Sequence, residues 1–206
     1  MLTRLIPLFI LSGALNVLGQ DEPTPATYTF GLEHVAVHGR ITGIVDGDTI
    51  NVLVLGKQQI RVRLAFVDAP ERDQAFGRHA KQAMSELVFG KDVKLRPHTI
   101  DSDGRVVARV LIDNQDAGLE LLRRGLCWVY EKYVGEASVE IQNSYREAQD
   151  TAHAEKLGLW QDPDPEPPWE WRKRQHITTR SQSVNSLSIA CCSIIPEVCR
   201  SIPLLP

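Results

Sequence analysis

Acidic residues, arginines and turn-forming residues come together in four short segments of this chain, residues 46–49, 63–67, 68–71 and 103–105. Each segment alone has an ordinary structural explanation, because Asp-Gly pairs are common in turns and strands often end in surface acids. Hydrolysis of a phosphodiester bond needs a Lewis acid on a phosphate oxygen, a base for the attacking water, and cations that stabilise the developing negative charge. The four segments together supply these groups, so their combination indicates phosphodiester chemistry.

Two aspartates in these segments can bind a hard cation. Asp48 and Asp68 offer carboxylate oxygens, which Ca²⁺ prefers as ligands. Pro70 favours an extended backbone at Ala69, and an extended residue can present its carbonyl oxygen as a third ligand. We therefore predict a Ca²⁺ site formed by Asp48, Asp68 and Ala69.

Three further residues can act on the substrate. Glu71 follows Asp68 by three positions and can reach a water molecule beside the metal ion. Arg63 and Arg105 can each grip a phosphate with two parallel hydrogen bonds, which lysine cannot do. We predict that Arg63, Glu71 and Arg105 are the catalytic residues, and that Asp103 lies outside the reacting groups.

This assignment requires the side chains of Arg63 and Asp68 to point to the same side of the backbone. Arg63 and Asp68 are separated by an odd number of residues, so a regular strand would point their side chains to opposite faces. Both can serve one site only if the strand bends before Asp68 or if the arginine reaches around an edge.

Other motifs are incomplete. Residues 101–104 resemble the start of an EF-hand loop but lack the later acidic ligands. The six histidines are scattered, and neither a Ser-His-Asp arrangement nor a zinc motif is present. Cys127 lies in an apolar run and is predicted to be a small core residue rather than a nucleophile. The other cysteines give no paired metal spacing, and the disulfide pairing of the four stays open: Cys127, Cys191, Cys192 and Cys199.

Regular elements must position these residues. Residues 37–45, 50–55 and 58–67 predict three strands joined by short turns, and the Asp-Gly pair at residues 46–47 suits a tight turn with positive φ angles. Helical periodicity and capping residues predict three helices, and the remaining strand patterns complete the domain. The predicted helices cover 76–89, 117–124 (capped by Asp116) and 138–156, and the further strands cover 92–96, 105–112 and 126–129.

The N-terminus has the features of an export signal. A positively charged start is followed by a short apolar run and small residues, which predicts a signal peptide over residues 1–19 and a secreted or periplasmic protein. The alternative is a buried first helix. The apolar run is shorter than a typical membrane-spanning helix, so no stable membrane insertion is expected after cleavage.

Composition changes on both sides of the predicted domain. Residues 20–35 are expected to form a leading linker and residues 36–160 the domain itself. Residues 161–206 form a tail with a Pro-rich part, a Trp and basic part, and a part rich in Ser, Thr and Cys. In the middle part, Trp169, Trp171 and the basic run can contact nucleic acid, or the tryptophans can pack on the domain while the cations stay solvated. Beyond that part, disorder and the remnant of a further module are both left open.

The net charge limits how a polyanion could be recognised. The 206 residues are 43% hydrophobic and 24% charged, with a formal net charge of -3. A protein that holds nucleic acid by bulk charge is strongly basic, so that class is excluded. Any recognition of phosphates must depend on a few placed cations.

From about Gly39 to Trp160, the order and spacing of these motifs resemble the thermonuclease (staphylococcal nuclease-like) family. The resemblance implies an α+β protein with an OB-fold five-stranded barrel and three helices. By position, Asp48, Asp68 and the Ala69 carbonyl look like that family's calcium ligands, and Arg63, Glu71 and Arg105 like its catalytic trio. The implied activity is Ca²⁺-dependent endonuclease cleavage of DNA and RNA with little sequence specificity, giving 3′-phosphate ends.

The chain departs from the family at two places. Ala69 stands where threonine is frequent, a change that a backbone ligand survives. Ser102-Asp103 stands where the best-known members have Lys-Tyr, and an acid beside Arg105 should weaken local attraction for phosphate. Tyr130 and Tyr133 can stack on a base or contact phosphate, or they can be ordinary core or surface tyrosines.

Two other functions are compatible with the same pattern. One is a non-catalytic OB-fold module that binds nucleic acid or a protein, although such a module would have no need of Glu71. The other is a Ca²⁺-dependent phosphodiesterase that acts on a small molecule, which the near-neutral charge allows. No protein partner is evident from the sequence, and a monomer is expected.

Overall fold

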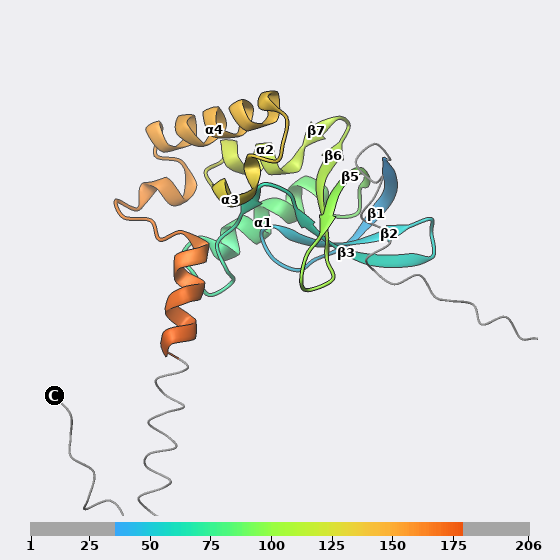
Figure 1. The fold of residues 1–206 in the computed structure, drawn as a ribbon, viewed down its shortest axis with the longest axis horizontal. Helices are drawn as coiled ribbons and strands as arrows, with labels where there is room; N and C mark the ends of the chain where they lie inside the picture. The colour runs from blue at the N-terminus through green and yellow to red at the C-terminus, as the bar shows by residue number, and fades with distance from the viewer. Residues whose placement is uncertain (1–35, 179–206) are drawn as a thin grey trace, which may run out of the picture.

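The computed structural model describes residues 36–178 of the chain, which form a β-barrel with helices beside it (Figure 1). The barrel strands are β1 (Val37–Ile44), β2 (Thr49–Val54), β3 (Gln58–Leu64), β5 (Asp92–Ile100) and β6 (Val106–Ile112). Neighbours in the order β3-β2-β1-β5-β6 pair antiparallel, and a parallel pairing of β3 with β6 closes the barrel. The predicted five-stranded OB-fold barrel is confirmed.

The third predicted strand is broken where the site requires a bend. β3 ends at Leu64, and Phe66 has a φ angle of 66°, a left-handed conformation that bulky residues seldom adopt. The chain then forms the short strand β4 (Val67–Asp68), which pairs with β8 (Trp128–Val129) instead of with the barrel. The prediction of one continuous strand over 58–67 was wrong, because tertiary pairing outweighs local strand propensity there.

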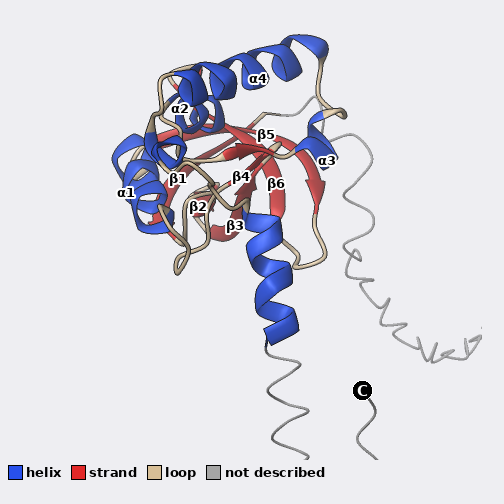
Figure 2. Ribbon diagram, turned by 90° about the vertical axis from the view of Figure 1, so that its left-hand side faces the viewer, coloured by secondary structure: helices blue, strands red, loops and turns tan. Residues whose placement is uncertain are grey.

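Helices lie at the left and along the top of the barrel strands in the view of Figure 2. The three predicted helices are present as α1 (Gly77–Val88), α2 (Ala117–Arg123) and α4 (Val139–Ala154). Asp116, at the end of β7 (Gln115–Asp116), caps α2 as predicted: its carboxylate accepts hydrogen bonds from the Gly118 and Leu119 backbone N–H groups. The one-turn helix α3 (Glu131–Val134) and the 3₁₀-helix η3 (Gly158–Gln161) were not predicted.

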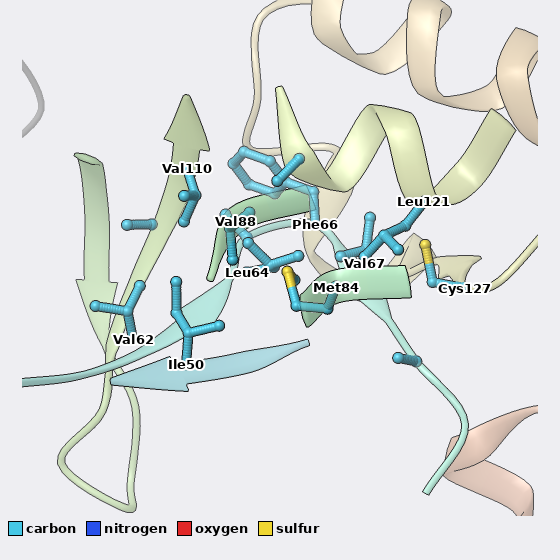
Figure 3. Close-up of a cluster of buried hydrophobic side chains, with 14 of the residues drawn as sticks. Ile50, Val62, Leu64, Phe66, Val67, Met84, Val88, Val110, Leu121 and Cys127 are labelled. Carbon is cyan, nitrogen blue, oxygen red and sulfur yellow. The ribbon is translucent and has the colours of Figure 1, made fainter. Parts of the chain in front are cut away.

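A continuous apolar core joins the barrel interior to α1 and α2 (Figure 3). Strand residues alternate between this core and the surface, as in Ile50 and Val52 of β2, which are completely buried. Met84 and Leu121 supply the matching helix faces. Cys127 is a free, fully buried thiol within the core, as predicted, and burial raises its pKa.

The chain continues past the barrel domain into a second helical segment. After the Pro-rich part, residues 168–178 are helical and are called the tail helix below. The tail helix projects beside the barrel (Figures 1 and 2). The predicted signal peptide and linker, and Cys191, Cys192 and Cys199, lie outside the described residues. Within residues 36–178, no helix has the length and apolar character needed to cross a bilayer.

Candidate active site

The turn between β1 and β2 places Asp48 next to the bend at Asp68. Gly47 in this turn does not have the positive φ angle that the Asp-Gly pair suggested, so that part of the turn prediction was wrong. Position 47 requires glycine because of packing instead: an added Cβ would lie 2.8 Å from the Cβ atoms of both Ala69 and Ala80. The close approach lets the Ala69 backbone N–H donate a hydrogen bond to Asp48 Oδ2 at 3.1 Å.

Arg63 joins the two aspartates into a buried ion-pair cluster. Residue 63 lies on β3 directly opposite Thr49, and its guanidinium contacts Asp48 Oδ2 through Nη1 at 3.0 Å and Asp68 Oδ1 through Nη2 at 2.6 Å. The side chains of Arg63, Asp48 and Asp68 are 14%, 5% and 0% exposed. The bend at Phe66 thus brings Arg63 and Asp68 to one side, as the predicted site requires.

Burial governs the electrostatics of this cluster. Loss of hydration raises the pKa of Asp48, although the charge of Arg63 and the hydrogen bonds from Ala69 and Thr49 act in the opposite direction. For Arg63, burial alone would lower the pKa, but the negative charges of Asp48 and Asp68 outweigh it and hold the pKa above its ordinary value. The guanidinium therefore stays charged and fixed between the two acids.

Glu71 is held by the loop that leads from Pro70 into α1. Its backbone N–H donates to Gln74 Oε1 at 3.1 Å, and its carbonyl accepts from the Gln74 N–H at 2.9 Å. A Cβ on Gly77 would collide with the same Glu71 carbonyl, so glycine is needed for this loop to pack against the start of α1. The Glu71 side chain is 33% exposed and can reach both the cluster and solvent.

Arg172 of the tail helix is a member of this cluster that sequence reasoning missed. Its Nη2 contacts Asp68 Oδ2 at 2.7 Å, and its Nη1 contacts Glu71 Oε1 at 2.7 Å and Asp68 Oδ1 at 3.2 Å. Trp169 packs on Trp128 and Tyr130 of the domain, as one of the two expectations had it, but the expectation that the cations of this segment stay solvated was wrong for Arg172. The basic run beside Trp169 and Trp171 was the available signal, yet it could not identify partners about a hundred residues away.

Arg105 is held in a different way, within the turn between β5 and β6. Its Nε contacts Asp101 Oδ2 at 2.8 Å, and its Nη2 contacts Asp103 Oδ2 at 3.1 Å. Partial burial would raise the pKa of Asp101, but hydrogen bonds from Arg105 and its charge lower it overall. Gly104 has a φ angle of 74°, as an Asp-Gly turn predicts. Asp103 contacts the Arg105 guanidinium directly, so it is the acid beside Arg105 that can compete with a phosphate, while its place outside the reacting groups stays a prediction.

One cavity of about 720 Å³ brings these side chains together. The three predicted catalytic residues line it, together with both predicted substrate-binding tyrosines and Arg172: Arg63, Glu71, Arg105, Tyr130, Tyr133 and Arg172. Asp48 and Asp68 do not line the cavity themselves: they are buried behind Arg63, which pairs with both and lines the cavity. Three guanidinium groups and four carboxylates line this concave surface, and the guanidinium groups are the ones that can bind a phosphate: Arg63, Arg105 and Arg172, with Glu71, Asp101, Asp103 and Glu136.

Aromatic rings form another wall of the cavity. Tyr130 stacks on Trp169 of the tail helix, with ring centroids 5.8 Å apart and planes inclined by 5°. Tyr133 meets Tyr130 edge to face at 4.9 Å and is 39% exposed. One face of Tyr130 is therefore covered by protein, whereas Tyr133 presents surface on which a base can lie.

The donor set at Asp48 and Asp68 fits a hard divalent cation. Arg63 and Arg172 supply two positive charges against the three negative charges of Asp48, Asp68 and Glu71, so a cation would be drawn toward the negative charge that remains. Among residues 36–178, no three His, Cys, Asp or Glu side chains are gathered as metal ligands. An ion here would have two carboxylates and would complete its shell with backbone oxygen, such as the Ala69 carbonyl, and with water.

A closed five-stranded barrel with this acid and arginine cluster at its edge defines an OB-fold protein of the staphylococcal nuclease type. Comparison with known families gives the same result, because residues 61–162 match the family model described as "Staphylococcal nuclease homologue". The chain belongs to this family.

Curated relatives cover most of the same domain. An "Uncharacterized endonuclease" of Haemophilus influenzae is 38% identical over 138 residues, which are 67% of this chain and 74% of the relative. An Escherichia coli protein with the same description is 37% identical over 140 residues, 68% of this chain and 87% of the relative. A "Micrococcal nuclease" of Shigella flexneri is 36% identical over 150 residues, 68% of this chain and 83% of the relative.

Proposed function

We propose that this protein is a Ca²⁺-dependent endonuclease that hydrolyses DNA and RNA with little sequence specificity and leaves 3′-phosphate ends. The observation that carries the proposal is the convergence of Arg63, Glu71 and Arg105 on one cavity, with Asp48 and Asp68 directly behind it. The names of the relatives support a nucleic acid as substrate.

The residues divide the chemistry in the following way. Asp48, Asp68 and the Ala69 carbonyl would hold Ca²⁺, which supplies Lewis acidity toward a phosphate oxygen. Glu71 orients water and takes up its proton at a carboxylate oxygen while the water oxygen bonds to phosphorus. The bond between phosphorus and the 5′ oxygen breaks, and the 5′ oxygen leaves as a hydroxyl after taking a proton from solvent. Arg63 and Arg105 donate hydrogen bonds to the phosphate oxygens, and these bonds strengthen as negative charge concentrates there.

The alternatives make different demands on the same groups. A non-catalytic binding module would use the arginines and aromatic rings but would not need Glu71 beside them. A phosphodiesterase for small molecules would use all the groups but would leave polymers intact. We further propose, on the basis of the export-like N-terminus, that the protein acts outside the cytoplasm.

The function is tested by incubating the full-length protein with supercoiled plasmid and with RNA, in Ca²⁺ and in chelator. We expect cleavage of both polymers in Ca²⁺, none in chelator, and little in Mg²⁺ because its strict octahedral preference suits this site poorly. Glu71→Gln should reduce the rate by about 10² or more. Binding of both polymers without cleavage would favour the non-catalytic binding module. Hydrolysis of small phosphodiesters alone would favour the phosphodiesterase for small molecules.

A further inference from the structure

The contact between the tail helix and the aspartate cluster has a consequence for cation binding. Every oxygen of the two aspartates accepts at least one hydrogen bond, and Arg172 is the donor at Asp68 Oδ2. Asp68 has no exposed side-chain surface, so Arg172 covers the side from which this carboxylate would be reached. A guanidinium and a divalent cation therefore compete for one carboxylate.

The tail helix is anchored well enough to make this contact specific. Gln74 Nε2 donates to the Glu166 carbonyl at 2.5 Å, and Trp169 packs on Trp128 and Tyr130. Arg172 is about one-third exposed, whereas Lys173 and Arg174 on the same helix are 66% and 56% exposed and pair only with Glu170 and Glu166 among the described residues. Of these neighbouring cations, Arg172 alone enters the site.

We infer that Arg172 is a positioning residue that serves as an internal counter-cation: it holds Asp68 and Glu71 together in the ion-free protein and yields Asp68 to a divalent cation. In the ion-free state, Arg63 and Arg172 offset two of the three negative charges of Asp48, Asp68 and Glu71. This inference rests on the proposed function, because it assumes that the aspartates bind the ion.

The inference predicts the direction in which affinity changes. If the docked state excludes the ion and is populated to about 90%, the apparent Kd is raised about tenfold above the intrinsic value. Removing Arg172 should recover that factor. A residue that merely supported the fold would instead weaken ion binding when it is lost.

The test is calorimetric titration of the full-length protein with Ca²⁺, without nucleic acid. Arg172→Ala should bind Ca²⁺ about tenfold more tightly than wild type. Arg174→Ala, which removes an equal charge from the same helix, should match wild type. Arg172→Lys, which keeps the charge but loses the planar fork, should lie between wild type and Arg172→Ala and also serves if the alanine variant does not fold.

Several results would overturn the inference. They are equal or weaker binding by Arg172→Ala, an equal gain in Arg174→Ala, or no Ca²⁺ binding by any of these proteins. Tighter binding by Arg172→Ala in a protein that cuts no polymer would support the inference and defeat the proposed nuclease function, so the two failures are distinguishable.

Discussion

Arg63 and Arg105 line the same cavity, yet they are held by opposite kinds of structure. Arg63 lies on a barrel strand between two almost completely buried aspartates that come from different parts of the chain. Arg105 pairs with Asp101 and Asp103 of its own turn, where Asp103 is 69% exposed. One half of the cavity is thus fixed by the fold, and the other by a local turn.

Because their partners differ in burial, the two arginines should contribute differently to the stability of the protein. A charge whose partners are buried cannot be removed without leaving those partners unpaired in a medium of low polarity. A charge whose partners are near solvent can be removed at small cost, because water replaces it. We therefore expect the Arg63 side to couple folding with function, and the Arg105 side to affect function alone.

The largest effect is expected for Arg63→Ala. It leaves Asp48 and Asp68 without their shared partner, which should cost about 3–5 kcal/mol of unfolding free energy. Turnover should also fall by at least about 10², because a hydrogen-bond donor to the transition state is lost. Denaturant titration and initial cleavage rates measure the two effects. If Arg63→Ala unfolds at the same denaturant concentration as wild type, the Arg63 side does not couple folding with function.

Arg105→Lys is expected to have a comparable effect on turnover but little on stability. Lysine keeps the positive charge and loses the planar fork, so the rate should fall by roughly 10² while unfolding free energy changes by less than about 1 kcal/mol. Ground-state binding of DNA should fall only modestly. A loss of stability equal to that of Arg63→Ala would show that the two sides are not different in kind.

Asp103→Asn should have a smaller effect in the opposite direction. It removes an exposed carboxylate that competes with phosphate for Arg105, so the KM for DNA should decrease by about two- to fivefold at low salt, with kcat close to wild type. The change should shrink at high salt because the charges are screened. A KM that stays constant across salt concentrations would mean that Asp103 does not compete for Arg105.

The smallest expected difference between the Arg63 side and the Arg105 side is the pH at which their aspartates take up protons. The pKa of Asp48 lies above its ordinary value of 3.8 and that of Asp101 below it, so Asp48 should take up its proton first as the pH falls. Because the pKa of Asp48 is raised in the folded protein, this group adds to the unfolding free energy as the pH falls from its folded pKa to about 3.8. The lowered pKa means that the stabilisation from Asp101, present above about 3.8, is lost as the pH falls through its folded pKa. Carboxyl carbon NMR shifts followed through an acid titration would show the order, and the reverse order would contradict the description of the two sides.

Local sequence patterns were sufficient for most of the fold. Alternating apolar residues predicted the barrel strands, and Asp116 marked the start of α2 because a carboxylate can accept from free N–H groups at a helix end. The break at Phe66 could not be predicted, since it depends on β4 pairing with β8 some sixty residues later. Gly47 was assigned to a turn angle, although its reason is contact with Ala69 and Ala80.

The site shows the same division. The residue types and spacing of Asp48, Arg63, Asp68, Glu71 and Arg105 indicated which side chains could meet, because chemistry limits the useful combinations. The contact of Arg172 with Asp68 and Glu71, by contrast, depends on packing that no local pattern contains. Long-range contacts of single charged side chains are the part of this site that only the structure provides.

The most direct measurement is a crystal structure of the slow variant Glu71→Gln with Ca²⁺ and a short DNA oligonucleotide. The two sides should then meet on one phosphate, with its oxygens contacted by both Arg63 and Arg105 and the ion bound to Asp48 and Asp68. A phosphate held by Arg105 alone, or an ion bound away from the two aspartates, would contradict the proposal that the fold-held and turn-held arginines form a single active site.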